Sequence, residues 1–337
     1  MTEAELDELL STPRAETVEA IRSRPGDIVV LGAGGKMGPT VSRMAARAAN
    51  LVGDGRRVFA VSRFSAETAR RELGGAGVET IVCDLLDRDA VAGLPDAPNV
   101  IFMAGQKFGT AAAPSATWAM NTVVPAICAE RYRAANFVAF STGNVYPLTA
   151  IASGGAREAD AVGPVGEYAT SALGRERVLE FYSDRYRTLM AILRLNYAID
   201  LRYGVLADIA LRVWRGEPVP LAMGHVNVVW QGDASRIALE SLAQVATPPF
   251  IVNVTGGETL SVRALAEEFG RAFAKSVRFK GTERAKSLLS NTDLMRARFA
   301  APDVSVDRMI QLVADWIRGG GRLLGKPTHF DERAGSF

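Results

Sequence analysis

The stretch Asp27-Ile-Val-Val-Leu-Gly-Ala-Gly-Gly-Lys-Met-Gly38 decides the fold of this chain of 337 residues. Its apolar start predicts a short buried strand, which ends directly in glycines. Glycine allows a tight turn and a close approach of backbone to a pyrophosphate, and the N–H groups that begin the next helix attract phosphate. The pattern predicts a dinucleotide-binding loop, with a purely structural turn as the alternative. The loop residues are Gly32, Gly34, Gly35, Lys36, Met37 and Gly38.

Similar apolar runs alternate with helix-forming segments as far as Leu195. This alternation is typical of a parallel sheet covered by helices on both faces, so we expect an α/β, doubly wound (Rossmann) fold. The further expected strands are Arg57–Ser62, Thr80–Cys83, Val100–Ala104, Phe137–Ser141 and Leu189–Leu195, and the expected helices between them are Lys36–Ala49, Ser65–Leu73 and Ala116–Ala134.

The pattern changes beyond Asn196, where we expect a smaller, mostly helical C-terminal substrate region. Its helices are expected at 208–215, 233–242, 262–273 and 305–318, with a short strand pair near 218–229. The domain prediction is an N-terminal helical extension (1–25) packing outside the core and a dinucleotide-binding domain (26–195). These are followed by the substrate region (196–318), some segments of which return to the Rossmann core, and by a loosely held tail (319–337).

Composition disfavours several classes of protein. The 39 basic and 37 acidic side chains give a net charge of +2, without the long basic run typical of nucleic-acid binding. Cys83 and Cys128 stand in apolar runs, which favours buried thiols and a cytoplasmic protein. With only two histidines, His225 and His329, a zinc site is not expected. No apolar segment is long enough to span a bilayer, so no membrane partner is expected.

The end of the predicted second strand bears on cofactor choice. An NAD site usually places a carboxylate there for the ribose hydroxyls, but this strand ends in Ser62 and Arg63. A guanidinium suits a 2′-phosphate, and Lys36 adds charge, so we expect NADP, with NAD as the alternative. Asp84 and Leu85, after the third strand, are expected at the adenine, unless Asp84 only caps the next helix.

Three later motifs carry a family resemblance. They are Met103-Ala-Gly-Gln-Lys-Phe-Gly109, Ser141-Thr-Gly-Asn-Val-Tyr146 and Glu167-Tyr-Ala-Thr-Ser-Ala-Leu-Gly-Arg-Glu176. With the glycine loop, they resemble an extended short-chain dehydrogenase/reductase of the NAD-dependent epimerase/dehydratase family, from about Asp27 to Arg318. The resemblance implies the following roles: cofactor contacts from Ala104, Gly105, Lys107 and Tyr168, structural support of the site by Asn121, a catalytic hydroxyl on Thr142, and proton transfer by Tyr168.

One family residue is missing, because Ala172 stands where the motif has a lysine four residues after Tyr168. In the family that lysine holds the nicotinamide ribose and lowers the pKa of the tyrosine. An unassisted tyrosine has a pKa near 10, so at pH 7 about one in a thousand is ionised. Arg175, two helical turns after Tyr168, and Lys107 are candidate replacement cations. The alternative is that Arg175 only solvates the helix and Lys107 only touches a cofactor phosphate.

These features predict an NAD(P)-dependent oxidoreductase or epimerase. The resemblance implies a nucleotide-sugar substrate, with a smaller polyol or sugar acid as the alternative, held by Asn144, Asn196, Tyr203 and Arg284. It also implies a homodimer in which the helices holding Asn121 and Tyr168 pack against their symmetry mates. Because of Ala172, a non-catalytic protein that senses NADP(H) or scaffolds a partner is the competing interpretation.

Overall fold

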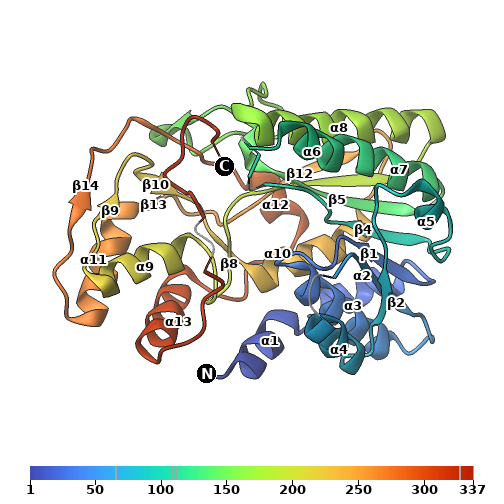
Figure 1. Cartoon of the computed structure of the whole chain (residues 1–337), viewed down its shortest axis with the longest axis horizontal. Helices are drawn as coiled ribbons and strands as arrows, with labels where there is room; N and C mark the ends of the chain where they lie inside the picture. The colour runs from blue at the N-terminus through green and yellow to red at the C-terminus, as the bar shows by residue number, and fades with distance from the viewer. Residues whose placement is uncertain (65–66, 108, 111, 326–327, 337) are drawn as a thin grey trace.

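The computed structural model describes residues 1–64, 67–107, 109–110, 112–325 and 328–336. Within them, a seven-stranded parallel sheet has the order β12-β7-β5-β4-β1-β2-β3 (Figure 1). Strand order reverses between β1 and β4, which opens a crevice at the carboxyl ends of these strands. The predicted doubly wound fold is therefore confirmed. The strands are β1 (Ile28–Leu31), β2 (Val58–Ser62), β3 (Glu79–Val82), β4 (Asn99–Phe102), β5 (Asn136–Thr142), β7 (Met190–Leu195) and β12 (Phe250–Val254).

Helices cover both faces of this sheet, and this explains why β1 is apolar at every position. Consecutive side chains of a strand point to opposite faces. Ile28 and Val30 pack with α2, α3 and α10, whereas Val29 and Leu31 pack with α5, α7 and α8. The covering helices are α2 (Ala15–Arg22), α3 (Gly38–Val52), α4 (Glu67–Gly75), α5 (Arg88–Ala92), α7 (Val124–Arg131), α8 (Gly166–Tyr186) and α10 (Gln231–Glu240).

The expected helix Ala116–Ala134 is in fact three segments: α6 (Pro114–Trp118), a π-helical turn η1 (Ala119–Val123) and α7. Pro125 explains the break, because proline lacks the N–H that an α-helix would donate to the carbonyl of residue 121. Such π-turns occur often at functional sites. This one presents Asn121, which is fully buried.

The N-terminal segment does not lie outside the core, so that prediction was wrong. Leu6 and Leu10 of α1 (Glu3–Ser11) are fully buried in the C-terminal core, and Ile21 of α2 is fully buried in the core under the sheet. The apolar faces of both helices were visible in the sequence, but the surfaces that they cover come from residues far along the chain.

The C-terminal region has its own core, built around α9 (Val205–Arg215), α11 (Val262–Phe273) and α13 (Val306–Arg318). The predicted strand pair near 218–229 was wrong, because β9, β10 and β11 pair with β14, β13 and β8 instead of with one another. The remaining elements are β6 (Thr149–Ala150), β8 (Ala198–Ile199), β9 (Val219–Pro220), β10 (His225–Val226), β11 (Val229–Trp230), β13 (Leu260–Ser261), β14 (Phe279–Lys280), β15 (Lys286–Ser287), α12 (Asp293–Arg298) and the 3₁₀ turns η2 (Gly143–Val145), η3 (Ile151–Ser153) and η4 (Ser241–Ala243).

The end of the chain is also better anchored than expected. Residues 328–336, which we call the C-terminal strap, include Phe330, which is 2% exposed and packs in the C-terminal core. The Thr328 N–H and hydroxyl donate to Asp208 Oδ2 at 2.7 and 2.5 Å. The prediction of a loosely held tail with few core residues is wrong for this segment. No helix in the described ranges has the length and apolar character needed to cross a membrane.

Candidate active site

The glycine loop joins β1 to α3 and allows no side chain at three positions. A Cβ on Gly32, whose φ is +86°, would lie 2.5 Å from the Ala104 backbone nitrogen, and one on Gly38 would lie 2.2 Å from the Ala33 carbonyl oxygen. A Cβ on Gly34 would lie 2.5 Å from Ser62 Oγ. No described side chain caps the start of α3. Backbone N–H groups at an uncapped helix start fit a pyrophosphate.

Replacing Gly38 by alanine is expected to lower the free energy of unfolding by roughly 1–3 kcal/mol, because the new methyl group overpacks the loop against fixed backbone. Chemical denaturation measures this change. Gly35→Ala is the matched control, since a Cβ there would meet nothing nearer than the Gly32 carbonyl at 3.5 Å. Equal stability of both variants would show that the loop is not packed as described.

The ends of β2 and β3 hold the residues predicted to meet the adenosine part of a cofactor. Arg63 is exposed, immediately after Ser62, and Leu85 is buried. Asp84 Oδ1 accepts from the Leu86 N–H at 3.0 Å. The helix cap considered for Asp84 is supplied instead by Asp87, whose Oδ1 accepts from two N–H groups of α5 at 3.0 Å.

Lys36 is directed across the crevice. Its ammonium lies 3.2 Å from the ring centroid of Tyr203, a cation–π contact between the glycine loop and a predicted substrate residue. Burial raises the pKa of Tyr203, and the nearby Asp208 and Tyr168 raise it further. Lys36 therefore links the glycine loop to Tyr203, which lies outside the Rossmann strands.

Asn121 joins the loop after β4 to the helix that carries Tyr168. Its Oδ1 accepts from the Gln106 N–H at 2.9 Å, and its Nδ2 donates to the Gln106 carbonyl at 3.0 Å and to Ser171 Oγ at 2.9 Å. Arg175 Nη2 also donates to Asn121 Oδ1, at 2.7 Å. All four hydrogen-bonding positions of the amide are used. The loop holding Gly105 is thereby fixed relative to α8.

The predicted proton-transfer pair is brought together. Thr142 ends β5, and Tyr168 lies in the first turn of α8, where the two side chains hydrogen-bond. Burial raises the pKa of Tyr168, and the Thr142 hydrogen bond and the charge of Arg175 partly offset that rise. Thr142 Oγ1 also accepts from Asn144 N and Nδ2, at 3.2 and 3.0 Å. The amide of Asn144, predicted to bind substrate, therefore orients Thr142.

Arg175 and Lys107, the two candidate replacement cations, lie at different places around the site. Arg175 is 6% exposed and lies beneath Gly105, where a Cβ would come within 2.3 Å of its Nη2. Its Nη1 donates to the Phe140 carbonyl at 2.8 Å. Lys107 Nζ lies 5.7 Å from the ring centroid of Tyr168, and burial lowers the pKa of Lys107 to about 8. The side chain of Arg175 is buried in the site and does not solvate the helix.

Ala172 itself points into protein. It is 1% exposed and packs with Val145, Tyr146 and Ala156 in a small apolar cluster. A lysine at this position would have to place its charge beside these residues or displace them. The packing explains how the chain accommodates alanine here.

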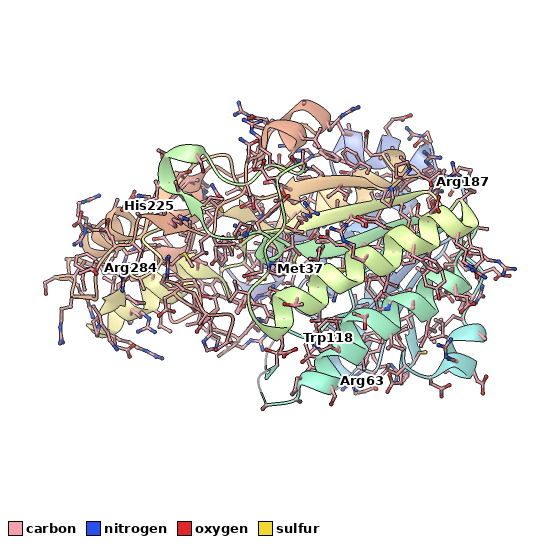
Figure 2. All side chains as sticks on the ribbon, turned by 90° about the horizontal axis from the view of Figure 1, so that it is seen from above. Met37, Arg63, Trp118, Arg187, His225 and Arg284 are labelled. Atoms are coloured by element: carbon pink, nitrogen blue, oxygen red, sulfur yellow. The ribbon has the colours of Figure 1, made fainter. Side chains whose placement is uncertain are left out.

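The predicted substrate residues do not all lie together. Asn196 is 2% exposed and lies against the turn after Thr142, since a Cβ on Gly143 would be 3.2 Å from Asn196 Cβ. Arg284 is exposed. Figure 2 shows Arg284 in the same end of the molecule as His225 and well apart from Met37 at the start of α3. Arg284 is therefore remote from the glycine loop.

The comparisons with known proteins agree with the fold described above. The chain has the fold of three solved structures, each less than 25% identical to it. The first is UDP-glucose 4-epimerase from Thermotoga maritima with UDP-glucose, which is 18% identical with a TM-score of 0.70 over 87% of this chain and 99% of that chain. The second is UDP-glucose 4-epimerase from Thermus thermophilus with NAD, which is 22% identical with a TM-score of 0.70 over 87% of this chain and 99% of that chain. The third is DesIV, a dTDP-glucose 4,6-dehydratase from Streptomyces venezuelae with NAD bound, which is 20% identical with a TM-score of 0.72 over 88% of this chain and 98% of that chain. No curated protein sequence matches the chain significantly.

The sequence model of the NAD dependent epimerase/dehydratase family matches residues 28–202. This range begins in β1 and includes the glycine loop, Asn121, Thr142 and Tyr168, the residues that the structure places around the crevice. It covers more than half of the 337 residues. The chain therefore belongs to the NAD-dependent epimerase/dehydratase family.

Proposed function

We propose that this protein is an NAD(P)-dependent enzyme that epimerises, dehydrates or oxidises a nucleotide-linked sugar or a similar sugar-like substrate. This proposal rests mainly on the hydrogen bond between Tyr168 and Thr142, which lie at the same crevice as the glycine loop. A bound dinucleotide would supply the hydride exchange with a carbon that bears a hydroxyl or carbonyl. Its pyrophosphate would lie at the start of α3.

The side chains of the site act on the proton. Tyr168 takes the proton of the substrate hydroxyl as that carbon is oxidised and returns it as the carbon is reduced. Thr142 positions the reacting oxygen and hydrogen-bonds the phenol. Asn144 and Asn121 hold Thr142 and the loop after β4 in place. Each of these groups has a defined partner in the structure, as pre-organised proton transfer requires.

We further propose that Arg175 and Lys107 together replace the missing lysine. The charge of Arg175 favours the ionised form of Tyr168, which is the effect that the family lysine has on its tyrosine. Lys107, with a pKa of about 8, is still largely charged at pH 7. Arg175 provides a positive charge that its hydrogen bonds hold in place beneath Gly105. Lys107 provides a second positive charge near the ring of Tyr168.

The proposal is tested by NADPH and NADH binding, followed by turnover with UDP-glucose, UDP-galactose, dTDP-glucose and small polyols. Cofactor binding with turnover of one of these substrates is the expected result. The competing interpretation, a non-catalytic NADP(H) sensor or scaffold, is favoured by the absence of the motif lysine. It predicts tight cofactor binding without turnover of any compound, and this result would overturn the proposed enzyme.

Arg63 is expected to give a preference for NADP over NAD, since an exposed guanidinium follows β2 and no carboxylate stands there. Arg63→Gln should weaken NADPH binding roughly 10- to 100-fold and leave NADH binding unchanged, because a charge-assisted hydrogen bond is worth about 1.5–3 kcal/mol. Titration of cofactor fluorescence measures both affinities. Arg57→Gln, before β2, is the control, since Arg57 pairs with Asp27 at 2.9 Å. Tighter NADH binding by the wild type would contradict the preference.

Ala172→Lys is expected to lower the melting temperature, because the new ammonium enters an apolar cluster. It should not raise turnover, because in our proposal Arg175 and Lys107 already supply positive charge near Tyr168. Thermal unfolding and steady-state rates measure the two effects. Ala172→Met separates charge from volume and should be less destabilising. A gain in turnover at unchanged stability would instead show that the site lacks a cation.

We also propose that the protein is a homodimer through the surface of α6, η1 and α8. The apolar side chains exposed there include Trp118 (38%), Val123 (42%) and Phe181 (57%). Tyr132, at the end of α7, is 3% exposed, and its hydroxyl donates to the Pro95 carbonyl, so it belongs to the core and not to this surface. Light scattering of the wild type and Phe181→Glu tests the dimer, since the new charge should favour the monomer.

A further inference from the structure

The first helix, α1, joins the Rossmann part to the C-terminal region. In Figure 1 it lies between α13 and α3. Leu6 and Leu10 are fully buried among side chains of the C-terminal core, whereas Glu8 forms an ion pair with Arg47 of α3. The family model begins at residue 28, so α1 lies outside the matched range. The contacts of α1 therefore add to the matched part of the chain a connection between its two cores.

Asp7 of α1 pairs with one arginine from each part. Its Oδ2 lies 2.5 Å from Arg43 Nη1 on α3, and its Oδ1 lies 2.9 Å from Arg202 Nη1 in the C-terminal region. Two other carboxylates approach these arginines. Glu72 lies 3.5 Å from Arg43 and Glu3 lies 4.0 Å from Arg202, and both are more exposed than Asp7. Among the residues that the structure describes, Asp7 alone pairs with both arginines.

Arg202 belongs to a short turn, residues 200–203, which we call the crevice turn. Its Nε and Nη2 donate to Asp200 Oδ1 and Oδ2 at 3.0 and 2.7 Å. The backbone closes the turn, since the N–H groups of Asp200 and Tyr203 donate to each other's carbonyls at 3.0 and 3.1 Å. Tyr203 is the residue whose ring meets the ammonium of Lys36 in the glycine loop. The position of Arg202 therefore affects how the turn meets that loop.

The crevice turn is also tied to the start of α3. Gln231 Nε2 donates to Thr40 Oγ1, in the first turn of α3, at 3.0 Å and to Asp200 Oδ2 at 3.5 Å. On the other side, the Leu324 N–H donates to the Arg202 carbonyl at 3.0 Å. These bonds and the Asp7 ion pair restrain the turn from different directions. A change at Asp7 therefore acts on a turn that has few other connections to α1.

We propose that α1 is a clamp between the Rossmann part and the C-terminal region, in which Asp7 is a positioning residue for the crevice. Asp7 keeps Arg202 at a fixed distance from α3, and the crevice turn passes this position on to Tyr203. Tyr203 in turn restrains the glycine loop through Lys36. A bound dinucleotide leaves sooner when this restraint is lost. Only this last step rests on the proposed function.

The first test measures residue-resolved hydrogen exchange in the full chain without cofactor. In Asp7→Asn the amides of Asp200 and Tyr203 should exchange roughly 3- to 10-fold faster, the size of effect expected for loss of partly exposed ion pairs. The buried leucines of α1 are unchanged, so the helix should stay in place. Asp7→Glu should restore part of the protection. Glu8→Gln is the matched control, because Glu8 pairs with α3 only, and it should leave both rates unchanged.

The second test measures NADPH dissociation by stopped flow. Asp7→Asn should release NADPH roughly 3- to 10-fold faster, again from the loss of the two ion pairs. Lys36→Met removes the contact with Tyr203 and has its own effect on the cofactor. In that background Asp7→Asn should cause no further acceleration, because residues that act through one contact are not additive.

Unchanged exchange of the crevice turn in Asp7→Asn, or equal acceleration in Glu8→Gln, would overturn the clamp. Equal acceleration of NADPH release by Asp7→Asn with and without Lys36 would overturn the route through Tyr203. Failure of the proposed function has a different signature, which is absent turnover in the wild type. The exchange measurement uses no cofactor and no substrate, so its result stands apart from that outcome.

Discussion

Replacing Tyr168 by phenylalanine is expected to lower kcat by about 10²- to 10⁴-fold, the usual contribution of a positioned general acid–base. Only the phenol oxygen is removed, and that oxygen hydrogen-bonds Thr142 under the influence of the Arg175 charge. The affinity for NADPH should change little, because the glycine loop and the start of α3 are untouched. Steady-state turnover with the identified substrate, together with cofactor titration, measures both quantities.

Tyr182→Phe is the matched control, since Tyr182 lies on the same helix but outside the crevice. It should retain wild-type kcat. Normal turnover in Tyr168→Phe would remove Tyr168 from the reaction and with it the proposed mechanism. A loss of cofactor affinity equal to the loss of kcat would show that Tyr168 mainly holds the cofactor.

Arg194→Met is expected to lower the free energy of unfolding by about 3–5 kcal/mol, because it leaves the Glu176 carboxylate buried without its partner. Arg194 Nε and Nη2 donate to Glu176 Oε1 and Oε2 at 3.0 and 2.7 Å, and the two side chains are 3% and 0% exposed. Ser141 also donates to Glu176, at 2.5 Å. The pair therefore joins α8 to β5 and β7 directly behind Thr142. Chemical denaturation measures the loss.

The double variant with Glu176→Leu and Arg194→Met should lose less than Arg194→Met alone, since a well-packed apolar pair avoids the unpaired charge. Arg318→Ala is the exposed control, because the Arg318–Asp315 pair is about half-exposed on α13 and should contribute little. A loss in Arg194→Met no larger than in this control would contradict the role assigned to the buried pair.

The local parts of the site could be predicted from the sequence. The apolar run of β1 followed by Gly32 fixes a strand and a turn within a dozen residues, and the chemistry of glycine alone explains the loop. Thr142 and Tyr168 were found through motifs that keep their spacing along the chain. In contrast, the π-turn at Asn121 was missed, because helix-forming residues on both sides of Pro125 conceal the broken hydrogen bond.

What the sequence by itself determined is the succession of strands and helices along the Rossmann part and the glycine turn after β1, since each depends on short-range pattern. The candidate proton-transfer residues were identified through the resemblance to the family's motifs. Only the tertiary structure decided that Arg175 lies beneath Gly105, that Ala172 packs with Tyr146, and that the strap meets Gly166. These contacts join residues from different elements, and the last joins positions 166 and 335, which are far apart in the sequence. Packing of distant surfaces sets them, and no local preference of the chain encodes which surfaces meet.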